Sequence, residues 1–228
     1  MTVTRRCRSL LVLAVAACTA LAQTHYEGHF SMGGKAGFVL SRMQFNPTVP
    51  QTFLPGCTFG ATFRYVEENH FALMAELNVE QRGWKEDFEG LDFAYTRRLT
   101  YVQLPLLTHI YFGSNRVHGF FNAGPELGVM IGSSTSSNFD YADAATVAGF
   151  ASANRSIEQF TLPVHNRFDY GLTAGVGLEV FSRQRSSFTL EGRFYYGLAD
   201  VFRNHKKDAF SSSSGMTIMV TLGYMYRL

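Results

Sequence analysis

Ionisable side chains recur at every second position in several segments whose other positions are apolar. Glu76 and Glu80 alternate with leucine and valine, and Glu191 and Arg193 alternate with leucine and phenylalanine. On a strand, this spacing places the charges together on one face. Such a face could hold a catalytic carboxylate pair, line a polar pore, or form ion pairs that fill a core. The complete candidate set is Lys35, Arg64, Glu76, Glu80, Glu126, Asp169, Glu179, Glu191, Arg193 and Arg227.

Strands must position these charges. Clear alternation of apolar with polar or small residues covers five segments, and weaker alternation covers three more, so the sequence predicts eight strands. The clear segments are 57–65, 71–80, 168–180, 188–196 and 217–228, and the weaker ones lie near 30–41, 98–112 and 117–131.

The connections between these strands alternate strictly between long and short. The short ones are 67–70, 113–116 and 182–186, and the long, polar ones are 42–55, 83–97, 132–166 and 200–215. Short periplasmic turns, long extracellular loops and an even number of antiparallel strands are typical of outer-membrane barrels. The apolar faces also have the length of about 9–11 residues that a tilted strand needs to cross a bilayer.

A soluble barrel would turn its apolar face inward around a ligand. Here the polar face combines charges with glycines such as Gly171 and Gly175, which suits a narrow, crowded lumen, and Tyr224 and Tyr226 lie where an interfacial girdle would be. The predicted fold is therefore all-β: an eight-stranded antiparallel transmembrane β-barrel with short periplasmic turns and long extracellular loops.

The first 22 residues have the features of a secretory signal peptide. Arg5, Arg6 and Arg8 precede an apolar run, and Ala20-Leu21-Ala22 ends it, which predicts a signal peptide over 1–22 and an outer-membrane barrel domain over 23–228. The apolar run is about half the roughly 20 residues of a spanning helix, so a membrane anchor is disfavoured. Lipid attachment at Cys18 remains an open alternative to simple cleavage.

Cleavage would change the charge and cysteine content. Loss of three arginines leaves 17 basic against 18 acidic side chains, which excludes a nucleic-acid-binding role based on net charge. Cys57 would be the remaining cysteine, so the sequence predicts no internal disulfide, no metal site and no cofactor.

Five glycine- and aromatic-rich segments, in order and spread over most of the mature chain, resemble the PorT-like family of outer-membrane β-barrel proteins in Gram-negative bacteria. The segments are GGKAGFVLS, YVQLPLLTHIYF, FNAGPELGVMIG, DYGLTAGVGLEV and LEGRFYYGLADV. The resemblance implies a small integral barrel of the outer membrane and implies no particular activity. The C-terminal strand, which ends in alternating aromatics, resembles the signal read by the barrel assembly machinery during insertion.

The inward charges favour a filled lumen over a pore, because eight strands enclose just enough space for side chains and both signs of charge are present. A narrow passive channel stays open as an alternative, as does a lipid-modifying enzyme with a Ser/His/acid set. His109 has inward parity but lies near a periplasmic turn, and no spacing selects a nucleophile near His165 or His205. The sequence therefore predicts that the protein is not an enzyme.

The loops carry weaker signals. Asp140 and Asp143 lack the spacing of a calcium-binding loop. Asn154-Arg155-Ser156 matches a glycosylation sequon, which means little in a bacterial export setting. Arg203–Lys207 could contact lipopolysaccharide phosphates. We expect a monomeric outer-membrane protein in contact with lipid and lipopolysaccharide, with a structural or binding role through its loops.

Pro105 lies in the middle of the predicted strand 98–112. A proline cannot donate a ladder hydrogen bond, and every strand of a closed barrel has two neighbours. The sequence therefore predicts a bulge or a local ladder break at Pro105.

Overall fold

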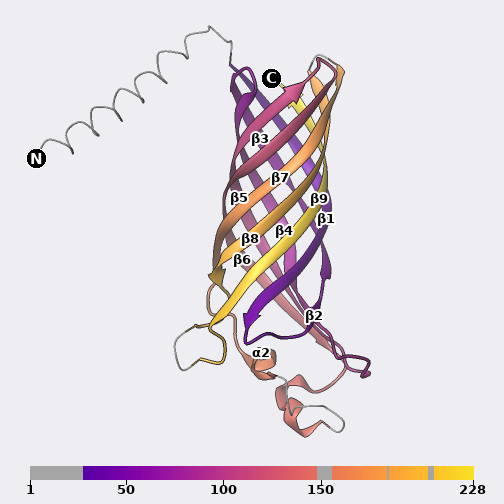
Figure 1. Ribbon diagram of the computed structural model, residues 1–228, viewed down its shortest axis with the longest axis vertical. Helices are drawn as coiled ribbons and strands as arrows, with labels where there is room; N and C mark the ends of the chain where they lie inside the picture. The colour runs from indigo at the N-terminus through magenta and orange to yellow at the C-terminus, as the bar shows by residue number, and fades with distance from the viewer. Residues whose placement is uncertain (1–27, 148–155, 184, 205–207) are drawn as a thin grey trace, which may run out of the picture.

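A computed structural model describes residues 28–147, 156–183, 185–204 and 208–228. The predicted signal peptide lies outside these residues. Eight long antiparallel strands form a closed, tilted ring (Figure 1), which confirms the predicted fold class. The long strands are β1 (His29–Asn46), β3 (Leu54–Glu68), β4 (Phe71–Glu86), β5 (Tyr95–Gly113), β6 (Val117–Ser137), β7 (Phe168–Arg183), β8 (Ser186–Asp200) and β9 (Ser212–Arg227).

The ring closes between the first and last strands. β1 pairs with β9 from Ser31↔Arg227 to Asn46↔Ser212, and β1 pairs on its other side with β3. Every other long strand pairs with its two neighbours in the chain. None of the eight long strands is therefore left with a free edge, so most main-chain groups within the bilayer are satisfied by the ladder.

The strands extend further toward the long-loop end than the sequence predicted. β1 continues to Asn46, β4 to Glu86, and β6 to Ser137, so the predicted loops 42–55, 83–97, 132–166 and 200–215 were too long. Their Ser/Gly-rich composition indicated loops. However, main-chain pairing between strands needs no apolar side chain, and Ser213 and Ser214 pair with Phe45 and Gln44 in the β1–β9 ladder. The connections that remain are 47–53, 87–94, 138–167 and 201–211, here called loops 1 to 4.

Short elements stand within these loops at the lower end of Figure 1. Loop 1 contains the two-residue strand β2 (Gln51–Thr52), which was not predicted and pairs with β4. Loop 3 contains the 3-10 helix η1 (Tyr141–Thr146) and the helix α2 (Glu158–Thr161). Within the part of the chain that the structure describes, no helix has the length and apolar character needed to cross a membrane.

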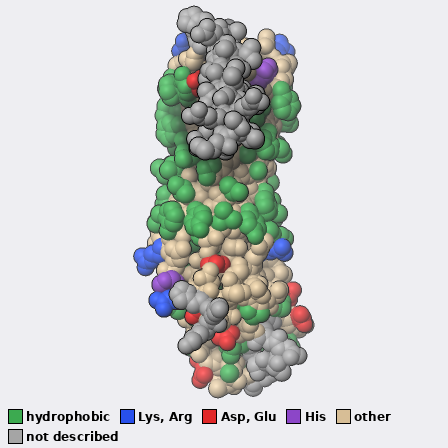
Figure 2. Space-filling view, turned by 60° about the vertical axis from the view of Figure 1, so that its left-hand side comes forward, with side chains coloured by type: hydrophobic (Ala, Val, Ile, Leu, Met, Phe, Trp, Pro, Cys, Tyr) green, Lys and Arg blue, Asp and Glu red, His purple; other side chains and the backbone are tan. Residues whose placement is uncertain are grey.

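The outward side chains form an apolar wall. Phe38 is 80% exposed and Leu222 is 68% exposed. Figure 2 shows, on one face of the barrel, a broad apolar band with most of the charged side chains above and below it. Side chains of the opposite parity, such as Thr58 and Arg64, are buried in the lumen. An apolar exterior around a polar interior is the arrangement that a lipid bilayer requires.

Two glycines make space for rings inside this narrow lumen. A Cβ at Gly177 would lie 2.3 Å from the Phe120 ring, and a Cβ at Gly171 would lie 2.7 Å from the Tyr195 ring. At the upper end of Figure 1, the short turns need unusual backbone angles: His70 has φ 81° and Gly113 has φ 142°.

The predicted ladder break at Pro105 is confirmed, without a bulge at that residue. In the β4–β5 ladder, Asn78 pairs with Gln103 and Ala75 pairs with Leu106, but Leu104 and Pro105 between them form no pair. The register is the same on both sides of this gap. On the other side, Pro105 pairs with Glu126. The register shift of β5 lies instead between Thr100 and Tyr101.

Candidate functional site: the charged lumen and its aromatic cap

The structure brings the charged side chains predicted from the sequence together inside the barrel, with one exception at its mouth. Arg227 is exposed at the short-turn end, whereas the side chains of the other predicted residues have at most 13% exposure. The buried residues form three adjoining clusters along the barrel, which we call the lumen network. It consists of Lys35, Arg64, Glu76, Glu80, Arg82, Glu126, Asp169, Glu179, Glu191 and Arg193.

The central cluster is built around Glu76 on β4 and Arg193 on β8. The Arg193 guanidinium donates two hydrogen bonds to the Glu76 carboxylate, 2.7 and 2.9 Å long, and two more to Glu191, 3.0 and 2.8 Å long. Lys35 Nζ donates to Glu76 at 2.6 Å, and the Asn78 amide donates to it at 3.0 Å. The fork of Arg193 therefore crosses the lumen and joins strands that are not neighbours in the ring.

The cluster toward the long loops is centred on Arg82. Its guanidinium contacts Glu80 at 2.5 Å, Asp169 at 3.0 Å and also Glu126. The same guanidinium lies 3.9 Å from the centre of the Tyr195 ring, and the Tyr195 hydroxyl donates to Asp169 at 2.8 Å. One arginine thus forms ion pairs with carboxylates from three strands and stacks on an aromatic ring.

The cluster toward the short turns pairs Arg64 with Glu179. Two hydrogen bonds of 2.6 and 2.8 Å join them, and Ser187 donates a third to Glu179 at 2.5 Å. His109 lies 3.5 Å from Arg64 and 2.7 Å from Asn122, whose amide donates to Glu191 at 2.8 Å. His109 and Asn122 therefore connect this cluster to the central one.

The lumen network leaves little space for ions or solutes. Two cavities among its side chains have volumes of about 10 and 20 Å³. A single water molecule needs about 10–15 Å³ of such volume. The charges thus form a plug, in which each buried charged group contacts at least one partner of opposite sign.

The long-loop end of the barrel is filled by apolar and aromatic side chains, which we call the aromatic cap. Phe45 packs against Trp84 with 5.3 Å between ring centroids and against Phe210 with 5.1 Å, and Tyr95 packs against Phe160 with 4.6 Å. Strand ends and all four loops contribute to it. The buried members are Met43, Phe45, Val49, Trp84, Phe88, Tyr95, Leu99, Tyr101, Met130, Ala144, Phe160, Val201, Phe202 and Phe210.

Arg97 fastens loop 3 to the cap. Its guanidinium lies 5.6 Å from the centre of the Trp84 ring and donates to the Leu162 carbonyl at 2.8 Å. Gln159, also fully buried, donates to Glu86 at 2.9 Å. The Arg97 contact satisfies a main-chain carbonyl of loop 3, and the Gln159 contact joins loop 3 to β4 through side chains.

The sequence analysis missed Arg82, Arg97 and the cap. Arg82 has the same parity as Glu76 and Glu80, so extending that alternation by one position would have found it. Arg97 and Trp84 fall within a predicted loop, and no local pattern shows that segments so far apart would pack together.

The weaker loop signals have ordinary structural roles in the described residues. The Asp140 carboxylate accepts from Ala142 N at 3.1 Å and caps η1, and among the described residues no cluster of His, Cys, Asp and Glu could hold a metal. Arg203 Nε donates to His165 Nδ1 at 3.3 Å. Asn154, Arg155 and residues 205–207, including His205, lie outside the described residues.

Known proteins support this architecture. The family model described as "Outer membrane protein beta-barrel domain" matches residues 21–203. No curated protein sequence matches the chain.

Among solved structures, OprG from Pseudomonas aeruginosa is similar, with 11% identity, 90% of this chain and 98% of that chain covered, and a TM-score of 0.54. Neisserial surface protein A shares 10% identity over 89% of this chain and 100% of its own, with a TM-score of 0.44. Outer Membrane Protein W from E. coli shares 14% identity over 90% of this chain and 100% of its own, with a TM-score of 0.39.

The family match covers most of the chain, and the closed ring, the apolar wall and the polar lumen agree with it. The chain belongs to the outer membrane protein beta-barrel domain family and is a small integral β-barrel protein of the outer membrane.

Proposed function

We propose that this protein is a non-conducting outer-membrane anchor that presents its extracellular loops as a binding surface. The observation that carries the proposal is closure of the lumen at two levels, by the lumen network and by the aromatic cap. A barrel closed in this way offers no continuous aqueous path through its described residues. Its remaining contact with the outside is the loop surface.

Electrical recording tests the closure directly. We expect the purified protein to give no stable conductance steps in planar bilayers, because the lumen cavities have room for only about one water each. Bilayers with detergent alone and bilayers with a wide general porin are the controls. A stable, large conductance from the pure protein would restore the alternative of a narrow passive channel.

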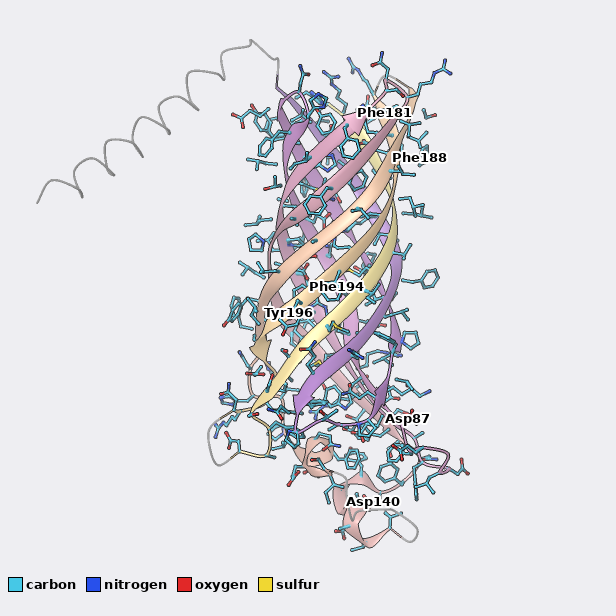
Figure 3. All side chains as sticks on the ribbon, in the orientation of Figure 1. Asp87, Asp140, Phe181, Phe188, Phe194 and Tyr196 are labelled. Atoms are coloured by element: carbon cyan, nitrogen blue, oxygen red, sulfur yellow. The ribbon has the colours of Figure 1, made fainter. Side chains whose placement is uncertain are left out.

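The loop surface has a chemical character that indicates its partner. Asp87, Glu89 and Asp92 on loop 2 and Asp140 and Asp143 on loop 3 are exposed, and Figure 3 shows Asp87 and Asp140 at the loop end. Exposed Leu91 and Tyr141 lie among them. An acidic surface with isolated apolar side chains favours a partner that presents basic and apolar groups.

Photo-crosslinking in intact cells tests this binding role. A crosslinking residue at Leu91 or Tyr141 is expected to give a discrete adduct, because both side chains project from the acidic surface. The matched control is the same residue at Arg116, which is exposed in a short turn at the opposite end. Absence of adducts at both loop positions, with the protein correctly inserted, would contradict the binding role.

Lipopolysaccharide and lipid are the other proposed partners. The apolar wall suits lipid, and the exposed Arg203 of loop 4 suits a lipopolysaccharide phosphate.

The paired edges of the ring support a monomer that is inserted by the barrel assembly machinery. The segments that resemble the PorT-like family support placing the chain near that branch.

We propose no enzymatic activity and no cofactor. His109 is held by Asn122 and Arg64 inside the lumen, and the side chain of His165 contacts Arg203. Neither arrangement activates a serine nucleophile. Incubation with lipopolysaccharide and phospholipid is expected to leave both intact by mass spectrometry, and released acyl chains would revive the alternative of a lipid-modifying enzyme.

A further inference from the structure

The barrel is hollow at its short-turn end, in contrast to its filled centre and capped outer end. A cavity of about 320 Å³ lies between the Arg64–Glu179 pair and the short turns, and we call it the periplasmic cup. Its lining comes from inward positions at the ends of several strands, including Ser31, Ser187 and Phe181, and Figure 3 shows Phe181 at this end. The volume is within the range of small-molecule sites, about 300–1,000 Å³.

The charge of the cup is predominantly positive. Among the described residues that line it, Glu179 is the carboxylate, and both its oxygens already accept hydrogen bonds from Arg64 and Ser187. Arg185 and Arg227 also line the cup, and neither forms an ion pair within the described part of the chain. The cup therefore has two arginines whose charge is not compensated by any carboxylate among its described lining residues.

These two arginines are held next to each other. The Arg227 main-chain N–H donates to the Arg185 carbonyl at 2.8 Å, so the side chains start from adjacent points on the rim. Below them, the buried Arg64 has an Nε with no hydrogen-bond partner. Guanidinium groups bind oxyanions through several hydrogen bonds, and an anion entering the cup would meet such donors at its rim and at its floor.

The wall of the cup is aromatic on one side. The rings of Tyr111 and His118 are stacked with 5.1 Å between centroids, and His118 packs edge-on against Phe181 at 4.8 Å. Such a wall can pack against a flat apolar body. The cup thus combines a cationic rim with an aromatic wall.

We propose that the periplasmic cup binds a small phosphomonoester whose phosphate lies between Arg185 and Arg227 and whose apolar body packs on Phe181 and His118. A phosphomonoester carries a charge of about −1.5 to −2 at neutral pH, which matches the two uncompensated arginines. The phosphomonoester could be a soluble ester of the periplasm or a lipid of the inner leaflet whose headgroup is a terminal phosphate. The site lies on the opposite side of the plug from the extracellular loops, so it is independent of the loop-binding role.

Calorimetric titration of the full mature protein in phosphatidylcholine nanodiscs, which leave both ends accessible, tests the site. The probes are phenyl phosphate, inorganic phosphate and the uncharged benzyl alcohol. We expect saturable binding of phenyl phosphate, weaker binding of inorganic phosphate and none of benzyl alcohol. Raising the salt concentration should weaken binding, because the rim is exposed to solvent. Absence of saturable phenyl phosphate binding at low salt would overturn the proposal.

Matched variants locate the binding. The double variant Arg185→Gln with Arg227→Gln is expected to weaken phenyl phosphate binding by about tenfold or more, since charged hydrogen bonds contribute most of the affinity. Arg116→Gln removes one positive charge from the same end of the barrel outside the cup, and should leave binding unchanged. Equal weakening by both changes would indicate non-specific attraction and would contradict the site.

Two further experiments test which part of the ligand Phe181 contacts and whether the ligand is a soluble ester or a lipid. Phe181→Ala should weaken phenyl phosphate binding while leaving inorganic phosphate binding unchanged, and an equal effect on both would contradict the aromatic contact. Nanodiscs containing phosphatidic acid, whose headgroup is a phosphomonoester, distinguish the sources. Competition that weakens phenyl phosphate binding to the wild type would assign the site to a headgroup, and undiminished binding would assign it to a soluble ester.

Discussion

Replacing Arg193 with glutamine is expected to lower the free energy of unfolding of the barrel by about 3–5 kcal/mol. Arg193 donates four hydrogen bonds to Glu76 and Glu191, and its side chain is only 2% exposed. Without it, Lys35 would be the one cation left beside two buried carboxylates in this cluster. The loss is therefore the cost of buried, uncompensated charge rather than the loss of a surface ion pair, which contributes about 0–1 kcal/mol.

Urea unfolding in lipid vesicles, followed by the change in gel mobility of the unboiled protein, measures this effect. The control is Arg116→Gln, which removes an exposed charge and should change the free energy of unfolding by at most about 0.5 kcal/mol. An Arg193→Gln protein as stable as this control would show that the network contributes nothing to the fold.

A double-mutant cycle gives a sharper test of the same contact. Glu76→Gln alone leaves the Arg193 and Lys35 charges short of a partner, and Arg193→Gln alone leaves the carboxylates short of one. The double variant should therefore cost less than the sum of the single ones, with a coupling of about 0.5–3 kcal/mol. Strict additivity would mean that the two side chains do not interact in the folded barrel.

Replacing Trp84 with alanine is expected to have a comparable effect on the aromatic cap, about 3–5 kcal/mol. Trp84 is fully buried, packs edge-on against Phe45 and Phe202, and lies under the Arg97 guanidinium. Its removal leaves a cavity at the point where β1, β4 and loop 4 meet. Loop 3, which Arg97 fastens to this point, should become more accessible to protease.

The matched variant Trp84→Phe separates ring packing from hydrogen bonding. The Trp84 Nε1 has no hydrogen-bond partner in the described structure, so phenylalanine removes ring volume without breaking a hydrogen bond. We expect a clearly smaller loss than for alanine, with loop 3 still protected. Leu91→Ala, on the exposed surface of loop 2, is the control for changes outside the core. Protease protection of loop 3 that is unchanged in Trp84→Ala would contradict the role of the cap.

The sequence predicted the barrel well because the bilayer leaves few alternatives. A lipid-facing strand must be apolar at every second position and must pair on both sides, so Phe188 to Tyr196 already shows which face meets lipid. The ladder break at Pro105 was predictable for a similar reason, because a missing N–H is a property of one residue. The ends of the strands were not predictable, since Ser212–Gly215 reads as a loop and pairs through its main chain alone.

The sequence by itself determined the eight long strands, their inward and outward faces and most of the residues that carry buried charge. These features follow from period-two alternation, which is local. Only the tertiary structure decided which charges pair, because Arg193 meets Glu76 from across the lumen and Arg82 gathers Glu80, Glu126 and Asp169 from three strands. The tertiary structure also decided that loops distant in sequence close the outer end and that the opposite end stays hollow, because the tilt and register of the closed ring bring those side chains to the same level.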